Sequence, residues 1–130
     1  MAIARKKILF IDDDQFIRKI YQSDLTARGF EVITAEDGEI GLRKVETDQP
    51  DLVICDLIMP QKNGFEVLEE LQKSGFSAKV PVIVHSNLAQ DADKERALHL
   101  GAREYLLKDE TTFDAMFEAV SRYLSVPVES

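Results

Sequence analysis

Leu52-Val53-Ile54-Cys55-Asp56 is an apolar run that ends in a carboxylate, and Met59-Pro60 follows three residues later. A continuous apolar run of this length between turn signals is typical of a strand that is buried on both faces of a sheet. In open parallel sheets, ligands bind outside the carboxyl ends of the strands. We therefore expect Asp56 to stand at the edge of a crevice, held by a rigid strand and open to water.

Short apolar runs elsewhere in the chain predict four more strands, at residues 8–11, 31–35, 82–86 and 104–107. Apolar residues recur at helical spacing after each strand, and helix stops such as Gly29, Gly75 and Gly101 follow. The last helix carries the clearest apolar stripe, in which Phe113, Met116 and Phe117 should face the core, and Pro127 ends it.

This alternation of strands and helices predicts an α/β fold, in which one parallel sheet is covered by helices on both faces. Because crossovers are right-handed, few topologies remain. We expect a flavodoxin-like (βα)5 doubly wound sheet of five strands in the order 2-1-3-4-5. Residues 31–35 hold few apolar positions and would form the sheet edge.

Length and composition are those of an ordinary globular domain, with 130 residues, 45% of them hydrophobic and 31% charged. We expect residues 1–130 to form a single domain whose core runs from about residue 7 to residue 125. The net charge of −8 disfavours nucleic acid and anionic membrane as direct partners. The single cysteine, Cys55, rules out an internal disulfide and favours a reducing compartment. With no bilayer-length apolar run and no signal peptide pattern, we expect a cytoplasmic protein.

Under the predicted strand order, polar residues at four strand ends converge on one crevice: Asp12 and Asp13, then Asp56, then Ser86, then Lys108. Three carboxylates in one crevice repel each other, so at least one would hold its proton unless a cation compensates. Mg²⁺ prefers oxygen ligands, usually one or two carboxylates, and keeps waters that a phosphate can replace. Asp13 and Asp56 would be direct ligands of Mg²⁺, and Asp12 would act close by or through water.

The same residues could receive a phosphoryl group on Asp56. A transferring phosphoryl group needs positive charge around its oxygens and a nucleophile in line. Mg²⁺ and Lys108 would supply the charge, Ser86 would donate its hydroxyl, and a carboxylate can serve as the nucleophile and become an aspartyl phosphate. The sequence therefore predicts a phosphate-accepting site in which a metal ion, an amine and a hydroxyl surround the acceptor carboxylate.

Taken in order, the motifs of this chain resemble the receiver domain of two-component response regulators. Each motif alone is weak, but together they stand at successive strand ends and cover essentially the whole chain. The residues that carry the resemblance are Ile11-Asp12-Asp13-Asp14, Asp56-Leu57-Ile58-Met59-Pro60 with Gly64, Ser86, and Tyr105-Leu106-Leu107-Lys108.

The resemblance implies that Asp56 accepts phosphate from the phosphohistidine of a histidine kinase or of a histidine phosphotransfer protein. It implies that Asp13, Asp56 and the backbone carbonyl of Ile58 bind Mg²⁺, with Asp12 assisting through water. Lys108 would pair with the phosphoryl group. Such a chain is a signalling domain that catalyses only its own phosphorylation and dephosphorylation.

The resemblance also implies a switch. Ser86 would move toward the phosphate and the ring of Tyr105 would turn inward, which changes the surface formed by the last two helices and the strand at residues 104–107. A downstream protein target would bind this surface. Whether phosphorylation also causes the chain to form a dimer is left undecided by the sequence. On the first helix, Phe16 would dock the histidine-bearing donor.

Asp109, Asn63 and Asn87 depart from the family pattern, which more often has an aspartate at the position of Asn63. Asp109 stands where a proline is usual after the lysine, so a cis bond there would cost about 2.5–4 kcal/mol. Asn87 stands where a small residue is usual, and the loop could carry an extra hydrogen bond. Ile58 and Leu88 are apolar and could shield an acyl phosphate from water.

Two other interpretations remain open. A phosphatase of the haloacid dehalogenase-like class also uses an Asp at a strand end with Mg²⁺, but it expects a second Asp where this chain has Ile58, and a covering insertion. A receiver-like binding module that is never phosphorylated is the third interpretation.

Single residues have plainer roles too: Asp12 to Asp14 could cap a helix, and Lys108 could be a solvated strand-end lysine. His85 should pack under a helix rather than assist Ser86, because neighbours on a strand point to opposite faces.

Overall fold

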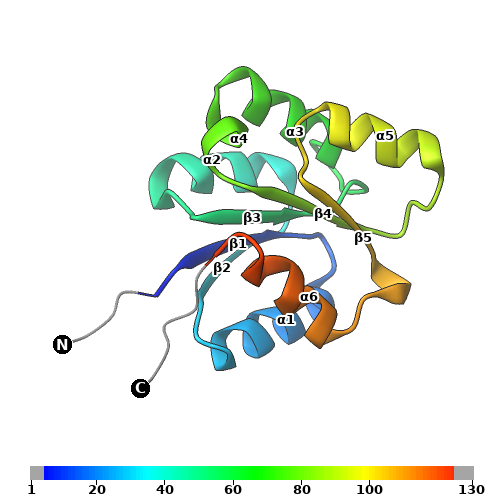
Figure 1. Ribbon diagram of the computed structural model, residues 1–130. Coiled ribbons are helices and arrows are strands. Elements are labelled where there is room, and N and C mark those ends of the chain that lie inside the picture. Colours follow the sequence, from blue (N-terminus) through cyan, green and yellow to red (C-terminus); the bar gives the residue numbers. More distant parts are fainter. Residues whose placement is uncertain (1–4, 125–130) are drawn as a thin grey trace.

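The computed structural model describes residues 5–124 and shows one five-stranded parallel sheet in the order β2-β1-β3-β4-β5 (Figure 1). The strands are β1 (Lys7–Ile11), β2 (Glu31–Ala35), β3 (Leu52–Cys55), β4 (Val82–Ser86) and β5 (Glu104–Leu107). The predicted fold class and strand order are confirmed, and β2 does lie at the edge.

Helices cover both faces of the sheet. One face carries α1 (Gln15–Ala27) and α6 (Phe113–Ser121), and the other carries α2 (Gly38–Asp48), α3 (Gly64–Lys73), α4 (Phe76–Lys79) and α5 (Asp91–His99) (Figure 1). A short 3-10 turn, η1 (Lys108–Glu110), links β5 to α6. Within residues 5–124, no helix has the length and apolar character needed to cross a membrane.

The register of the strands aligns their carboxyl ends. Ile11 pairs with Cys55 across β1 and β3, and Ser86 pairs with Leu107 across β4 and β5. Asp12 and Asp56 therefore begin adjacent loops, as do Asn87 and Lys108. The sheet order thus brings chain segments that are far apart in sequence to one edge of the molecule.

The central strands are buried on both faces because successive side chains alternate between two cores. Leu9, Ile11, Val53 and Cys55 belong to the core beneath α2, α3 and α5, whereas their neighbours in sequence belong to the core beneath α1 and α6. Burying one large aliphatic side chain contributes about 1.5–3 kcal/mol, so these two apolar layers hold the strand ends rigidly in place.

Local signals explain where the helices begin. Asp14 accepts hydrogen bonds from the amides of Phe16 and Ile17 and caps α1, so one of the three consecutive aspartates has the capping role. Asn63 and Glu66 form a capping box at the start of α3. A side chain that caps a helix in this way typically stabilises it by about 1 kcal/mol.

Three details differ from the sequence predictions. The short helix α4 has no counterpart among the predicted elements, because four residues are too few to show a helical period. Helix α5 begins at Asp91, inside the polar stretch from Asn87 to Asp93, where the sequence predicts a loop. Phe113, expected to face the core, is 39% exposed, although its ring contacts that of Tyr21 at 5.1 Å. The predicted stop at Pro127 lies outside the described residues.

Gly64 is required by close packing where α3 meets the loop after β3. A Cβ atom at this position would lie 2.1 Å from the carbonyl oxygen of Asp56 and 2.6 Å from the Cα of Leu57. We expect Gly64→Ala to lower the free energy of unfolding by about 2 kcal/mol, because neither backbone atom can move without shifting the loop.

Urea denaturation of Gly64→Ala would measure this loss, with Gly75→Ala as the control. Gly75 has φ +83°, but nothing lies within 4 Å of an added Cβ, so its substitution should cost only about 1 kcal/mol from backbone strain. Equal losses in the two variants would contradict the packing argument.

Candidate functional site

Three carboxylates lie together at the carboxyl edge of the sheet. One oxygen each from Asp12, Asp13 and Asp56 falls within a group whose members are all within 4.8 Å of one another. Asp12 is 1% exposed and Asp56 4% exposed, whereas Asp13 is open to solvent. Two buried acids and one exposed acid thus meet where β1 and β3 end, as the strand order predicted.

Lys108 lies between the two buried acids. Its Nζ is 2.8 Å from Oδ2 of Asp12 and 2.9 Å from Oδ2 of Asp56. The lysine follows β5 and leads into η1, so its side chain reaches across the end of β4 to the acids. The predicted grouping of Lys108 with the acids is present, and the amine bridges both of them.

Backbone amides fix the remaining oxygens of the buried acids. Oδ1 of Asp56 accepts hydrogen bonds from the amides of Leu57 at 2.7 Å and Ile58 at 3.4 Å. Oδ1 of Asp12 accepts from the amide of Asp14 at 2.9 Å. Each carboxylate is therefore held in one orientation, with one oxygen toward the backbone and the other toward Lys108.

Burial and charge act in opposite directions on these groups. Burial raises the pKa of Asp12 above its ordinary value, although the hydrogen bonds from Lys108 and from the amide of Asp14 partly oppose this. Burial alone would lower the pKa of Lys108, but its ion pairs with Asp12 and Asp56 outweigh that effect and raise it. The amine is therefore charged at neutral pH and stabilises the acids beside it.

A cavity of about 340 Å³ opens directly over the acids. Its lining consists of Asp13, Asp14, Asp56, Ile58, Asn87 and Lys108. Ile58 is 56% exposed and offers the one apolar side chain among these residues. A small anion entering this cavity would reach Asp56 next to the charged amine of Lys108.

Ser86 and Tyr105 meet through the backbone of Leu88 and do not line this cavity. Ser86 is fully buried, and its hydroxyl accepts a hydrogen bond from the Leu88 amide at 3.3 Å. The hydroxyl of Tyr105 donates to the Leu88 carbonyl at 2.7 Å. One loop residue, Leu88, thus forms hydrogen bonds with both predicted switch residues. A movement of this loop would change both hydrogen bonds.

Asn87 lines the cavity in a position where sequence reasoning expected Ser86. The one feature of the sequence that could have indicated this position of Asn87 is its place directly after β4, where the family pattern has a small residue. The pattern alone does not tell which of two consecutive residues faces the cavity, because the chain leaves the strand and enters a loop between them.

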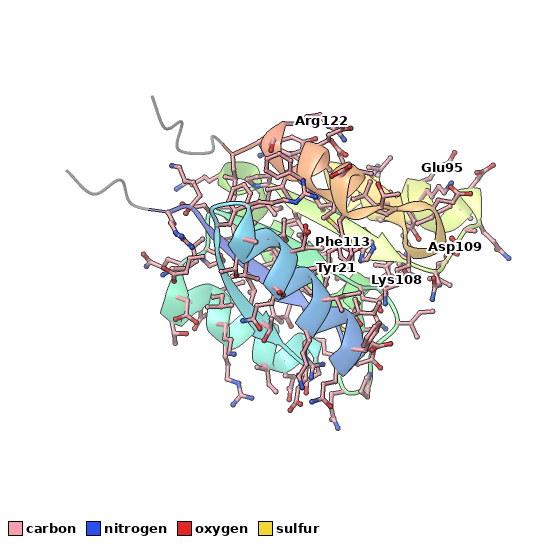
Figure 2. The ribbon with its side chains drawn as sticks, turned by 90° about the horizontal axis from the view of Figure 1, so that it is seen from below. Tyr21, Glu95, Lys108, Asp109, Phe113 and Arg122 are labelled. Atoms are coloured by element: carbon pink, nitrogen blue, oxygen red, sulfur yellow. The ribbon has the colours of Figure 1, made fainter. Side chains whose placement is uncertain are left out.

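His85 lies on the other face of β4, as predicted. It is buried against the rings of Tyr21 at 5.1 Å and Phe10 at 6.1 Å, and neither ring nitrogen has a hydrogen-bond partner among residues 5–124. Burial, with a smaller contribution from Lys108, lowers its pKa from 6.5 to about 4. Figure 2 shows Tyr21 of α1 and Phe113 of α6 beside each other between the two helices. His85 contacts Tyr21 and Phe10, so it belongs to an aromatic cluster, and its lowered pKa leaves it uncharged at neutral pH.

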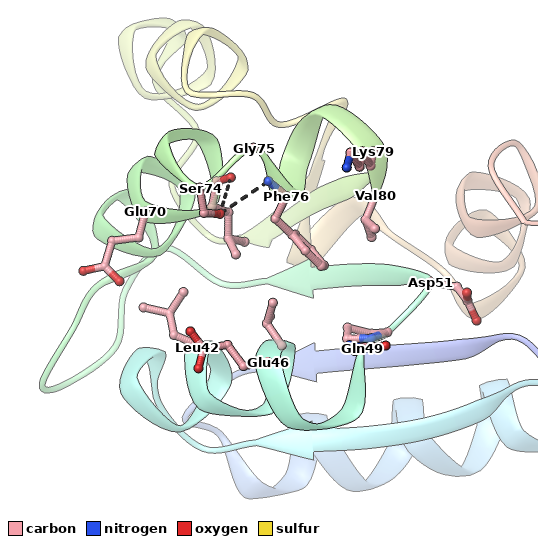
Figure 3. Close-up of a pocket in the computed structure, with 13 residues that line it drawn as sticks. Leu42, Glu46, Gln49, Asp51, Glu70, Ser74, Gly75, Phe76, Lys79 and Val80 are labelled. Atoms are coloured by element: carbon pink, nitrogen blue, oxygen red, sulfur yellow. Dashed lines mark hydrogen bonds between the residues drawn. The ribbon is translucent and has the colours of Figure 1, made fainter.

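A larger hollow, of about 660 Å³, lies at the opposite end of the sheet (Figure 3). It lies between α2 and the α3–α4 segment, where Leu42 and Phe76 face the gap, and Asp51 and Val80 mark the start of β3 and β4. It shares no lining residue with the acid cavity. Ligands of parallel sheets bind at the carboxyl ends, so the smaller, acidic cavity is the candidate site.

The donor atoms over Asp56 fit a hard divalent cation. The carboxylates of Asp12, Asp13 and Asp56 offer oxygen alone, which Mg²⁺ prefers over nitrogen and sulfur donors. Cys55 is buried, and burial raises the pKa of its thiol, so it offers no thiolate to a softer metal. The acids of this site are thus suited to Mg²⁺.

A family model described as the response regulator receiver domain matches residues 8–121. The chain is 40% identical over 108 residues to the probable transcriptional regulator ycf27 of Cyanophora paradoxa, covering 83% of this chain and 44% of that protein. It is 38% identical over 103 residues to the alkaline phosphatase synthesis transcriptional regulatory protein PhoP of Bacillus subtilis, covering 79% and 42%. The chain therefore spans less than half the length of these curated relatives.

Solved structures agree with this match. The chemotaxis protein CheY4 of Vibrio cholerae superposes with a TM-score of 0.86 at 27% identity, covering 93% of this chain and all of that one. A response regulator receiver domain protein from Clostridium thermocellum gives a TM-score of 0.82 at 31% identity, covering 91% and 93%. Both span nearly the whole of the chain described here.

Proposed function

This chain belongs to the family of response regulator receiver domains, and from that premise we propose that Asp56 accepts a phosphoryl group and becomes an aspartyl phosphate. The observation that carries the proposal is the carboxylate of Asp56, buried at a strand end, 2.9 Å from the amine of Lys108 and facing a cavity. A fixed nucleophile beside a fixed positive charge is what phosphoryl transfer requires.

The donor we propose is the phosphohistidine of a histidine kinase or of a histidine phosphotransfer protein. A carboxylate oxygen of Asp56 attacks phosphorus, and the new O–P bond forms as the N–P bond of the donor breaks. The imidazole nitrogen keeps the electron pair and takes up a proton. Lys108 stabilises the negative charge on the phosphoryl oxygens, and the Leu57 amide holds the other oxygen of Asp56 in place.

We propose Mg²⁺ as the cofactor of this step. Asp13, Asp56 and the carbonyl of Ile58 would hold it, with Asp12 assisting through water. The metal supplies positive charge at the phosphoryl oxygens. Asp12 has a second role in the protein itself, because its pairing with Lys108 keeps the amine directed at Asp56.

The change of state would begin at Ser86 and Tyr105. A phosphate adds about −1.5 to −2 charge and new acceptor oxygens, so the Ser86 hydroxyl, which accepts a hydrogen bond from the Leu88 amide, can turn and donate one to the phosphate. Tyr105 is tied to the same residue, and the α5–β5–α6 surface would change with it. We propose that a downstream protein reads this surface.

Phe16 marks the proposed docking site for the phosphodonor protein. It is 69% exposed on the first turn of α1, next to Asp14 at the rim of the cavity. A large apolar side chain in this position offers contact area to a partner that must bring its histidine to Asp56.

Incubation with acetyl phosphate and Mg²⁺, followed by intact mass measurement, tests the proposed function. We expect a gain of one phosphoryl mass that EDTA abolishes and that Asp56→Asn lacks. No gain in the native chain, or an equal gain in Asp56→Asn, would contradict the proposal.

Ile58 should slow the loss of the phosphoryl group, because its exposed apolar side chain at the cavity keeps water from the acyl phosphate. We expect Ile58→Asn to shorten the lifetime of the phosphorylated protein several-fold. The lifetime is measured as the decay of the phosphorylated mass after removal of acetyl phosphate, with exposed Leu98→Asn as the matched control. An unchanged lifetime in Ile58→Asn would show that shielding is unimportant.

A further inference from the structure

Asn87 is the first residue after β4 and lines the same cavity as Asp56. Its neighbour Ser86 is fully buried and is not part of that lining. On this ground, and resting on the proposed phosphorylation of Asp56, we infer that the side-chain carboxamide of Asn87 donates a hydrogen bond to an oxygen of the phosphoryl group.

The cavity offers few side-chain hydrogen-bond donors to an incoming phosphoryl group. A phosphoryl group brings strong acceptor oxygens that need hydrogen-bond donors. The lining side chains other than Lys108 and Asn87 are three aspartates and one isoleucine, which as carboxylates or hydrocarbon cannot donate. Lys108 is already shared between Asp12 and Asp56. Asn87 therefore holds the one other side-chain donor that faces the incoming group.

The state of Asn87 fits this role. It is exposed, and no residue within 5–124 forms a hydrogen bond with its carboxamide, so no existing bond is lost when it turns to the phosphate. By contrast, the Ser86 side chain is fully buried outside the cavity lining, so it must move before its hydroxyl can reach the phosphate. The amide is also neutral, so it adds no charge that would repel or displace the metal. Asn87 would thus contact the phosphoryl group before the loop rearranges, and Ser86 would follow.

The test uses beryllofluoride, which imitates a phosphoryl group on a carboxylate, in saturating Mg²⁺. Calorimetric titration gives its affinity for the native chain, Asn87→Ala and Asn87→Asp, and Gln90→Ala is the matched control. Gln90 carries a carboxamide in the same loop but does not line the cavity and makes no capping bond. Mg²⁺ affinity and thermal unfolding are measured separately for each variant.

We expect Asn87→Ala to weaken beryllofluoride binding roughly tenfold, the size of a lost hydrogen bond to a charged group. Asn87→Asp should weaken it further, because it replaces the donor by a charge of the wrong sign, and Gln90→Ala should leave it unchanged. An affinity of Asn87→Ala within twofold of the native value, or tighter, would overturn the inference. If the native chain binds no beryllofluoride and gains no phosphate, the proposed function itself fails, and these outcomes are therefore distinguishable.

Discussion

Lys108→Met should lower the free energy of unfolding at pH 7, without divalent cations, by about 3 kcal/mol. The substitution keeps the length of the side chain but leaves Asp12 and Asp56 buried without their shared amine. Removing one partner of a buried ion pair typically costs about 3–5 kcal/mol, because the other charge stays in a poorly solvated place. The loss should shrink as the pH falls, since Asp12, whose pKa burial already raises, can then take up a proton.

Two further variants show whether the loss comes from the buried charges. The double variant Asp12→Asn/Lys108→Met removes one uncompensated acid and should recover part of the stability. Lys73→Met removes an exposed ion pair with Glu69 and should cost less than about 1 kcal/mol. If Lys108→Met is as stable as Lys73→Met in urea denaturation, the amine does not hold the site together.

His85→Leu should remove a pH dependence of stability that the native chain carries. The unfolded chain binds a proton at His85 below pH 6.5, but the folded chain binds it only below about pH 4. Protonation of the unfolded state therefore costs stability as the pH falls from 6.5 to 4. The two values imply that His85 accounts for a loss of about 2 kcal/mol between pH 7.5 and pH 5.

Urea denaturation of both chains at pH 7.5 and pH 5 measures this contribution. The other titrating groups are shared, so the difference between the two chains isolates His85. Leu fits the apolar surroundings formed by Phe10 and Tyr21 and leaves no unpaired nitrogen. The variant should therefore be about 2 kcal/mol less sensitive to the pH change than the native chain. Equal sensitivity would mean that His85 is not held uncharged.

The fold could be predicted from the sequence because each strand has a strong local signal and a polar end. The runs at 31–35, 82–86 and 104–107 match β2, β4 and β5 residue for residue. Right-handed crossovers leave few strand orders, and in the flavodoxin-like order 2-1-3-4-5 the positions of Asp12, Asp56 and Lys108 lie at one edge. The grouping of these residues therefore depends on the strand order, which the structure confirms.

Side-chain detail could not be predicted in the same way. Lys108 bridges the two buried acids and Asn87 replaces Ser86 in the lining of the cavity, and both facts depend on the path of loops that carry no periodic signal. The exposure of Phe113 has a similar cause: it is the first residue of α6, where an apolar stripe extends past the core. The peptide bonds of the described residues are all trans, including the one before Asp109.

The central claim is that Asp56, and neither of the acids beside it, is the residue that becomes phosphorylated. Borohydride reduces an acyl phosphate to an alcohol, so it converts a phosphorylated aspartate to homoserine, which peptide mass spectrometry can locate. After treatment with acetyl phosphate and Mg²⁺, we predict homoserine at position 56 and unchanged aspartate at positions 12 and 13. Homoserine at Asp12 or Asp13, or at no position in the chain, would contradict the account.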